Sequence, residues 1–352
     1  FLMARHKQIT KQLRHQVLSG RLKPGETLPN IQELAAEFDT SVYTIHTAIT
    51  PLVKDGLVER RRRFGTVVRH HSKVLTCAGI YCGDSLLDEW EYSFYRELSR
   101  ELQRQLGGAD VETKLFVDMR STPDHTEPLP ELVRAIESRE IQALFVPLCD
   151  GRTAPWLSRL PVPKSFVSSG LKLSPLHSDY DQMLELALTR LRDQGCRGVG
   201  MISAVRTSSD LTHPDFHMYD KFVDLISDLG LRIHNDWVIT PRDRAGDHDR
   251  YGYDSFKQLW SRPDRPDGLF VYPDTSARGV MAAALELGVR VPEDLKLIFH
   301  HNTGVSWHCP LAVDWIETDT ARWAAEMIAQ IHRQMQGKPI APVSLPFVIR
   351  EA

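Results

Sequence analysis

The sequence predicts an α/β protein in two parts: a small N-terminal module of helices closed by a β-hairpin, and a larger body with doubly wound parallel sheets. Two observations predict this division. About the first seventy residues show three helical patterns and then two short strands around a run of arginines, whereas from Val74 onward apolar strands alternate with amphipathic helices. The body holds about twice the strand–helix units that one small sheet needs, which indicates two similar lobes.

The composition fits a protein of this size with more than one core. The chain has 352 residues, of which 42% are hydrophobic and 25% charged, and no apolar run approaches the length of a membrane span. Its five cysteines are an odd number without a Cys-x-x-Cys pair, which favours a reduced protein over a disulfide framework or a zinc site. The first residues, 1–7, are too few and too polar for a signal peptide, so we expect a cytoplasmic protein without a membrane partner.

The charge is distributed unevenly along the chain. Residues 1–72 hold 12 of the 43 lysines and arginines but only 6 of the 46 aspartates and glutamates, which leaves 31 basic and 40 acidic residues for the remainder. A basic head on an acidic body is typical of a protein with one domain for a polyanion and another for a different partner.

The head begins with two helices. Ile9, Leu13 and Val17 recur at helical spacing and predict a first helix over residues 5–19. Asn30 followed by Glu33 has the spacing of a capping box, which predicts the start of a second helix. The inward-facing residues of this second helix are expected to be Leu34, Ala35 and Phe38.

A third helix should begin after the N-cap Ser41, and Pro51 should kink it or end its regular part. Its inner stripe is expected to be mostly Val42, Ile45, Ala48, Ile49 and Leu52. The residues that remain near the exposed side of its first turns are Tyr43, Thr44, His46 and Thr47. In a recognition helix, such N-terminal residues reach base edges in the major groove.

Two short strands, 57–60 and 66–68, then predict a hairpin with a basic tip over residues 61–65. Two short helices joined by a turn and followed by a basic hairpin form a winged helix-turn-helix, a module that reads duplex DNA.

The order of Gly-x-Leu-x-Pro-Gly from Gly20, Glu33-Leu34-Ala35, Gly56-Leu57-Val58 and Gly65-Thr66-x-Val68 resembles the DNA-binding domain of GntR-family transcription regulators. Where many such domains carry a DNA-contacting arginine, this chain has Gln32, Val42 and His46, so we expect more phosphate or minor-groove contact from the wing. The residues predicted to contact DNA are Gln32, Ser41, Tyr43, Thr44, His46, Thr47, Arg60, Arg61, Arg62, Arg63, Gly65 and Thr66.

The body is predicted from its alternating pattern. Strands are expected at 74–80, 111–117, 143–148, 163–167, 198–202, 237–239, 268–272 and 295–299. Helices are expected at 92–106, 129–138, 181–194, 219–229, 253–260, 277–287 and 321–335.

Three stretches of the body resemble the effector-binding domain of LacI-type regulators: Leu191-x-x-x-Gly195, Arg265-Pro266-Asp267-Gly268 and Leu287-Gly288-x-x-Val291-Pro292-Glu293-Asp294. The whole chain therefore resembles the regulators that join a GntR head to a LacI-type body. The resemblance implies a head over residues 1–70, a linker over 71–76 and a periplasmic-binding-protein-like body over 77–352. It also implies that residues 346–351 form the last strand of this domain. Two lobes joined by three crossovers, a ligand between them, and a homodimer that reads a palindromic operator are implied as well.

The ligand of such a body lies at the carboxyl ends of the strands. Those ends supply Asp84, Ser85, Trp90, Asp150, Ser169, Arg206, Asp274, His301 and Asn302 as predicted effector contacts. Hydrogen-bonding side chains and an aromatic face are what a sugar requires, so we expect a sugar or a related metabolite as effector.

We interpret the chain as a DNA-binding transcription regulator, most consistent with a repressor, and not as an enzyme. It has no nucleophile elbow, phosphate loop or dinucleotide fingerprint, so no cofactor is expected. Asp247-His248-Asp249 and His300-His301 are adjacent residues that rarely point at one ion, and we read the first group as part of a solvated loop. Two alternatives stay open: a DNA-binding protein whose body only dimerises, and a solute-binding component of transport.

Overall fold

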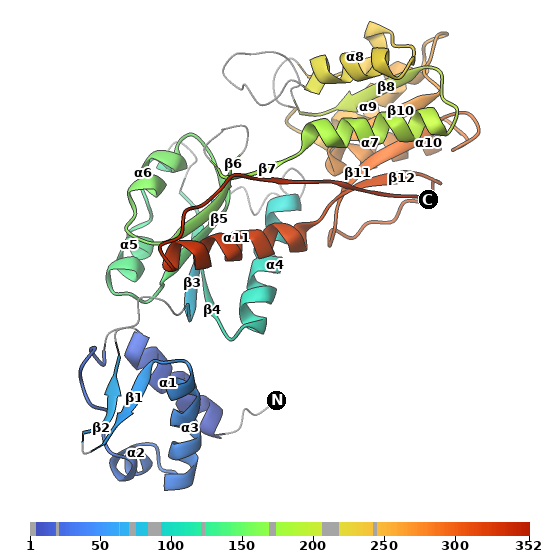
Figure 1. The fold of residues 1–352 in the computed structure, drawn as a ribbon. Helices are drawn as coiled ribbons and strands as arrows, with labels where there is room; N and C mark the ends of the chain where they lie inside the picture. The colour runs from blue at the N-terminus through green and yellow to red at the C-terminus, as the bar shows by residue number, and fades with distance from the viewer. Residues whose placement is uncertain are drawn as a thin grey trace.

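The computed structural model describes residues 5–18, 21–62, 64–69, 75–83, 93–120, 124–168, 174–205, 218–241 and 245–352. Figure 1 shows a small head at the N-terminal end, followed by two α/β lobes. The fold class predicted from the sequence, an N-terminal winged helix-turn-helix with two parallel-sheet lobes, is confirmed.

The head contains three helices and a two-stranded antiparallel hairpin: α1 (Arg5–Leu18), α2 (Ile31–Glu37), α3 (Val42–Lys54), β1 (Val58–Arg61) and β2 (Gly65–Val68). The predicted capping box is present, because the Asn30 side chain accepts from the backbone of Glu33 while the Glu33 carboxylate accepts from the Asn30 backbone. The buried residues of α3 are Ile45, Ala48, Ile49 and Leu52, as expected.

One detail of the predicted head is wrong. Val42 was placed on the inner stripe of α3, but it is 51% exposed because it lies in the first turn, before the helix reaches the head core. Pro51 was expected to kink α3 or to end its regular part, and of these two outcomes the second does not occur, because the helix continues to Lys54. Proline has no N–H, but the remaining residues of the last turn still pack into the core through Leu52.

The first lobe is a four-stranded parallel sheet with the strand order β4-β3-β5-β6. Its strands are β3 (Cys77–Gly83), β4 (Glu112–Asp118), β5 (Ala143–Cys149) and β6 (Lys164–Ser168). One face packs against α4 (Ser93–Gly108) and, from the far end of the chain, α11 (Thr320–Met335). The other face packs against α5 (Pro130–Glu137) and α6 (Thr153–Arg159).

The second lobe is a six-stranded sheet with the order β14-β12-β11-β10-β8-β9, parallel except for β14. Its strands are β8 (Val199–Ser203), β9 (Val238–Ile239), β10 (Gly268–Tyr272), β11 (Lys296–Asn302), β12 (Asp314–Thr318) and β14 (Val348–Arg350). Helices α7 (Tyr180–Asp193) and α8 (Met218–Asp228) share one core with the sheet. Helices α9 (His248–Trp260) and α10 (Asp274–Glu286) share the core on the opposite face.

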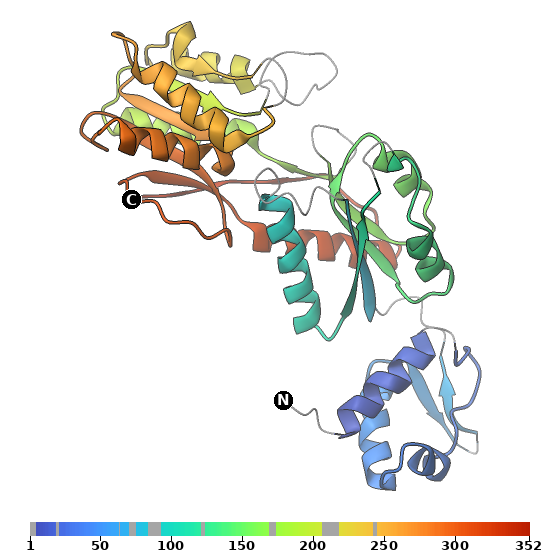
Figure 2. The same ribbon diagram turned by 180° about the vertical axis from the view of Figure 1, so that it is seen from behind.

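The chain crosses between the lobes three times, as the resemblance implied: from β6 to α7, from β12 to α11, and from α11 to β14 (Figures 1 and 2). Two of the crossings pair with each other in parallel, through β7 (Leu176–Ser178) and β13 (Val343–Leu345). The remaining crossing, from β12 to α11, is held by threonines. The Thr320 hydroxyl donates to the Thr303 carbonyl at 2.7 Å, and the Thr303 hydroxyl donates to the Thr318 carbonyl at 3.1 Å.

Among the described α-helices and strands of the body, α6, β7, β12 and β13 were not predicted. Three of them are short, and β12 has only two apolar residues, Trp315 and Ile316, next to each other between polar ones, so no alternation distinguished it from a loop. The interpretation of Asp247-His248-Asp249 as a solvated loop is also wrong. The Asp247 carboxylate caps α9 by accepting from the Arg250 backbone at 2.9 Å, and His248 is buried in its first turn.

Candidate DNA-binding surface and lobe-boundary site

The start of α3 presents its side chains to solvent. The Ser41 hydroxyl caps the helix by accepting from the Thr44 backbone at 3.1 Å, and it also lies 2.8 Å from the Thr44 hydroxyl. Tyr43 is 81% exposed, and the Thr47 hydroxyl donates to its carbonyl at 2.9 Å. Local hydrogen bonds therefore fix the first turns of α3, and the aromatic side chain of Tyr43 is exposed to solvent there.

The wing stands beside this helix. Arg60 Nη1 lies 3.2 Å from His46 Nε2, and since a guanidinium can only donate, the histidine nitrogen accepts. Arg61 forms an ion pair with Glu59, which also lies 3.4 Å from the Arg69 guanidinium. Arg62 is exposed, and Arg63 lies outside the described residues. One acidic side chain thus offsets part of the positive charge of the wing.

The remaining predicted contacts lie on the same module. Gln32 is exposed in the first turn of α2, where its backbone donates to the Asn30 side chain. Gly65 has a φ of +84° at the start of β2, and Thr66 is half-buried beside it. The exposure of these residues is compatible with contact to DNA, and that contact stays a prediction.

At the boundary of the two lobes, Asp274 is the centre of a hydrogen-bond network. It is the first residue of α10 and only 4% exposed. The Ser93 hydroxyl, from the first turn of α4 in the other lobe, lies 3.3 and 3.2 Å from its two carboxylate oxygens. The backbone N–H of Asp274 donates to His300 Nδ1 at 3.2 Å. A carboxylate of the second lobe is thus held by a donor from the first.

His300 is completely enclosed by this network. Because its Nδ1 accepts, its proton lies on Nε2, which is 2.9 Å from the Thr318 hydroxyl. Burial lowers the pKa of His300 to about 4, against the opposing effect of the Asp274 carboxylate, so the ring is neutral near pH 7.

Aromatic rings close the same site. The Tyr272 ring centroid lies 4.8 Å from that of His300, and the Tyr272 hydroxyl is 3.5 Å from the Tyr180 hydroxyl. Burial raises the pKa of both tyrosines, so both hydroxyls stay protonated and can donate or accept. The arrangement combines a carboxylate, hydroxyls and aromatic faces, which are the groups that bind hydroxyl-rich ligands.

His301 and Asn302, both predicted effector contacts, occupy the carboxyl end of β11. Since side chains alternate along a strand, His301 points away from the face of His300. Its Nε2 lies 2.8 Å from the Val305 carbonyl and its ring packs edge-on to Trp315. His301 therefore braces the loop after β11, whereas Asn302 is buried at the strand end.

Asp150 is a further predicted contact, at the carboxyl end of β5. Its Oδ1 accepts from the Thr153 backbone at 2.8 Å and from the Thr153 hydroxyl at 2.9 Å, and it caps the turn into α6. These bonds explain why the pKa of this carboxyl is lowered although burial opposes the shift. The predicted contacts that lie outside the described residues are Asp84, Ser85, Trp90, Ser169 and Arg206.

Sequence reasoning missed Ser93, His300, Thr318 and Tyr272. The alternation of a strand could have signalled His300, because two adjacent histidines at a strand end must face opposite sides. Ser93 carried no signal, since its role depends on a contact between residues 181 positions apart.

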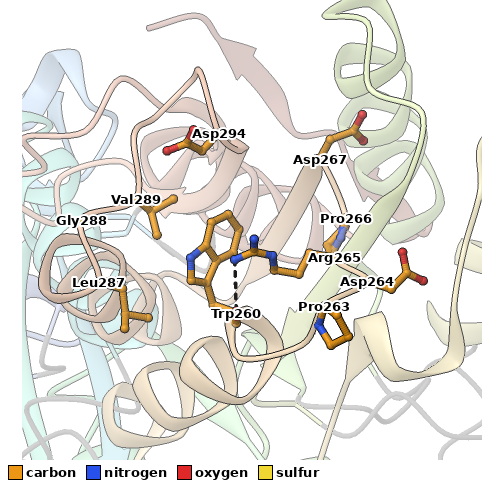
Figure 3. Close-up of a pocket in the computed structure, with 10 residues that line it drawn as sticks. All are labelled: Trp260, Pro263, Asp264, Arg265, Pro266, Asp267, Leu287, Gly288, Val289 and Asp294. Atoms are coloured by element: carbon orange, nitrogen blue, oxygen red, sulfur yellow. Dashed lines mark hydrogen bonds between the residues drawn. The ribbon is translucent and has the colours of Figure 1, made fainter.

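A cavity of about 540 Å³ lies at the other end of the second lobe, near the amino end of β10 (Figure 3). Arg265 packs on the Trp260 ring at 4.3 Å and donates to its carbonyl at 3.2 Å. Asp267 accepts from the Gly198 backbone at 2.8 Å, and Asp294 accepts from Arg290 Nε at 2.9 Å. Two of the stretches that carry the LacI-type resemblance line this cavity, and their aspartates fasten loops rather than face the lobe boundary.

Two searches for other kinds of site found nothing in the parts of the chain that the structure describes. No group of three or more histidine, cysteine or acidic side chains there is placed to hold a metal ion. None of the helices within the described ranges is long and apolar enough to cross a membrane.

A helix-turn-helix head with a basic wing, followed by two parallel-sheet lobes that cross three times, defines the ligand-binding class of DNA-binding regulators. Residues 5–68 match the model of bacterial regulatory proteins of the gntR family, and residues 188–351 match that of the periplasmic binding protein-like domain. By these matches, a GntR-type head is followed by a periplasmic binding protein-like body, which is the domain pair of a DNA-binding transcription regulator.

Curated relatives include the HTH-type transcriptional repressor PurR of Pasteurella multocida (strain Pm70), 26% identical over 153 residues that are 44% of this chain and 43% of the relative. PurR of Escherichia coli O139:H28 is 32% identical over 82 residues, 23% of each chain. This chain thus spans less than half of the length of these relatives.

Solved structures show the same fold in the body. The Escherichia coli transcriptional repressor ascG aligns with a TM-score of 0.58 at 15% identity, over 78% of this chain and 98% of that one. A LacI family regulator from Lactobacillus casei with bound sucrose aligns with a TM-score of 0.58 at 18% identity, over the same shares.

Proposed function

We propose that this protein is a transcriptional repressor whose operator binding is controlled by a small metabolite between the lobes, in the cytoplasm. The observation that carries the proposal is the Ser93–Asp274 contact. It joins the two lobes through a buried carboxylate, at the strand ends where doubly wound sheets bind ligands, in a chain that also carries a DNA-binding head.

The head supports operator binding through two surfaces. The first turns of α3 carry the exposed Tyr43 and the threonines predicted to reach base edges, and the wing carries Arg60, Arg61 and Arg62. Phosphate contacts from the wing supply affinity, and base contacts from α3 supply specificity.

A sugar or a related hydroxyl-rich metabolite is the proposed effector. Its hydroxyls would take the place of the Ser93 hydroxyl at Asp274 and approach Thr318, while Tyr272 offers an aromatic face. The Lactobacillus casei regulator with this body fold was solved with sucrose and with glucose, which is in keeping with this class of ligand.

The proposed control follows from the competition at Asp274. Once an effector replaces Ser93, the lobes lose one direct contact and can adopt a different relative position. A change in lobe position alters the spacing of two heads in a dimer, and so shifts the population away from the DNA-competent state.

The edge strand β4 supports a homodimer. Leu115 and Met119 are 45% and 64% exposed, and with Val117 they form an apolar stripe on one face of the strand. A second copy of the chain would cover this stripe and place two heads on a palindrome. Sedimentation of the full chain should give a dimer, and Leu115→Lys with Met119→Lys should give a monomer that binds a palindromic operator more weakly.

The experiment that tests the whole proposal measures DNA and effector together. Duplexes selected from a random pool by the full chain are titrated by fluorescence anisotropy at fixed salt, with a panel of mono- and disaccharides and purine bases. One compound should raise the melting temperature and weaken operator binding. DNA binding that no compound changes would leave a DNA-binding protein whose body only dimerises, and no DNA binding at low salt would reject the proposal.

A further inference from the structure

We propose that Phe64, at the tip of the wing, is an apolar wedge that enters the minor groove of the operator and partly unstacks one base step. This inference rests on the proposed DNA binding and adds a mode of recognition to it. The operator would then be selected partly by how easily its bases separate.

The position of Phe64 is unusual for an aromatic residue. Its ring is 71% exposed, although the nearby head core buries large apolar side chains such as Ile9 and Leu34 almost completely. An aromatic ring left in water forgoes the favourable free energy of burying its apolar surface. A partner that covers the ring would recover that free energy.

The hairpin geometry keeps the ring outside the head. Arg61 pairs with Gly65 at the end of the ladder, so Phe64 belongs to the short loop beyond it, where its N–H donates to the Arg61 carbonyl at 3.0 Å. Gly65 has a φ of +84°, and a Cβ there would lie 3.2 Å from the Thr27 side chain. The loop is therefore short and closed by the Arg61–Gly65 pair, and the Phe64 ring lies outside the head core.

The wing also lies where a second groove of the DNA would be. The contact of Arg60 with His46 holds the hairpin beside α3, the predicted major-groove helix. Figure 2 shows that β2 runs back toward the lobes, so the start of β2, next to Phe64, faces away from them. With α3 in the major groove, the tip extends over the neighbouring phosphates toward the minor groove.

The charges around the ring favour DNA over a protein partner. Arg61, at the end of β1, and Arg62, in the loop beyond it, are both exposed, and they would carry the ring to a groove lined by phosphates. Apolar side chains inserted between base pairs in the minor groove kink the duplex by about 20–90° and partly unstack the base step that they enter. Pyrimidine–purine steps such as TA unstack most easily, so the operator should hold one under the wing.

The test uses the full chain and duplexes that the wild-type protein selects from a random pool. Adenines under the wing are replaced in turn by 2-aminopurine, whose fluorescence rises when it unstacks, and a donor–acceptor dye pair on the ends reports bending. Phe64→Ala should lower affinity about tenfold and abolish both signals. Phe64→Leu, which keeps an apolar wedge, should restore part of each, and Val348→Ala, an exposed apolar residue of β14, should change neither.

Three outcomes would overturn the wedge. If Phe64→Ala binds, bends and unstacks DNA like the wild type, the wedge is wrong while the proposed DNA binding stands. If wild-type protein binds vesicles of phosphatidylglycerol through Phe64 but its DNA binding does not depend on that ring, the partner is a membrane. If the wild type selects no DNA at all, the proposed function fails, and the wedge with it.

Discussion

The Ser93 hydroxyl lies 3.3 and 3.2 Å from the two carboxylate oxygens of Asp274, across the boundary between the two lobes. Ser93 begins the helix after β3 and Asp274 begins the helix after β10, so each stands at the strand end of its own sheet. The contact links the two lobes through Asp274, the residue that sequence reasoning had chosen as an effector ligand.

Removing that link should affect stability and effector binding in opposite directions. Ser93→Ala should lower the free energy of unfolding of the body by about 1 kcal/mol, because a buried carboxylate loses a donor. The same change should tighten binding of the effector found in the screen, since no protein hydroxyl competes for Asp274. Calorimetry measures both, and Asp274→Asn should fold but lose the effector response. Unchanged effector affinity in Ser93→Ala would show that the Ser93 hydroxyl and the effector do not compete for Asp274.

Arg61 and Arg62 should account for a defined part of the salt dependence. Each phosphate contact contributes about 0.9 to the slope of log affinity against log salt, so replacing both arginines by alanine should reduce the slope by about two units per subunit. Anisotropy titrations at several salt concentrations measure it. Arg192→Ala with Arg250→Ala removes two exposed arginines of the second lobe and should leave the slope unaltered. If the variant without Arg61 and Arg62 keeps the wild-type slope, these two arginines do not contact phosphates and the wing is not part of the DNA-binding surface.

Glu59 restrains two arginines and should therefore weaken DNA binding. It pairs with Arg61 and lies 3.4 Å from Arg69, so Glu59→Gln frees both guanidiniums and removes a negative charge close to the phosphates. We expect several-fold tighter binding and a steeper salt slope, from the same titrations. Weaker binding would mean instead that Glu59 positions the arginines for their contacts.

The crossing of α9 and α10 depends on glycine. A Cβ on Gly279 would lie 1.8 Å from the Asp249 carbonyl oxygen, which is backbone and cannot move away cheaply. Gly279→Ala should therefore destabilise the second lobe by about 3 kcal/mol or more, through overpacking. Gly107→Ala is the matched control, because Gly107 lies in a helix with open space around its Cβ position and should be neutral or slightly stabilising. Thermal unfolding compares Gly279→Ala with Gly107→Ala. Equal melting temperatures of the two variants would contradict the close approach of α9 and α10 at Gly279.

His300 should make the protein less stable in mild acid. Burial holds its pKa near 4 in the folded state, against about 6.5 when unfolded, so between these values only the unfolded state takes up the proton. Above about pH 6.5 the neutral ring leaves the free energy of unfolding unaffected. As the pH falls from about 6.5 to 4, protonation of the unfolded state lowers the free energy of unfolding by up to about 3 kcal/mol. His300→Gln should flatten melting temperature against pH in this window, whereas His234→Gln, at an exposed position, should not. Identical profiles for His300→Gln and the wild type would exclude this role.

The sequence by itself determined the head and most of the alternation of strands and helices in the body, but not α6, β7, β12 and β13. Local signals define these features: the capping box at Asn30, the helical stripe from Ile45 to Leu52, and the alternation of apolar strands with amphipathic helices. Such signals depend on residues a few positions apart, so they can be read before the chain is folded.

Only the tertiary structure decided which polar residues meet. Asp274 keeps its predicted place at a strand end, but its partners, Ser93 and His300, come from a different lobe and a different strand. Asp150 instead caps a neighbouring turn, and His301 braces a loop on the opposite face of its strand. A strand end supplies a position for a side chain, whereas its hydrogen-bond partner depends on packing between elements far apart in sequence.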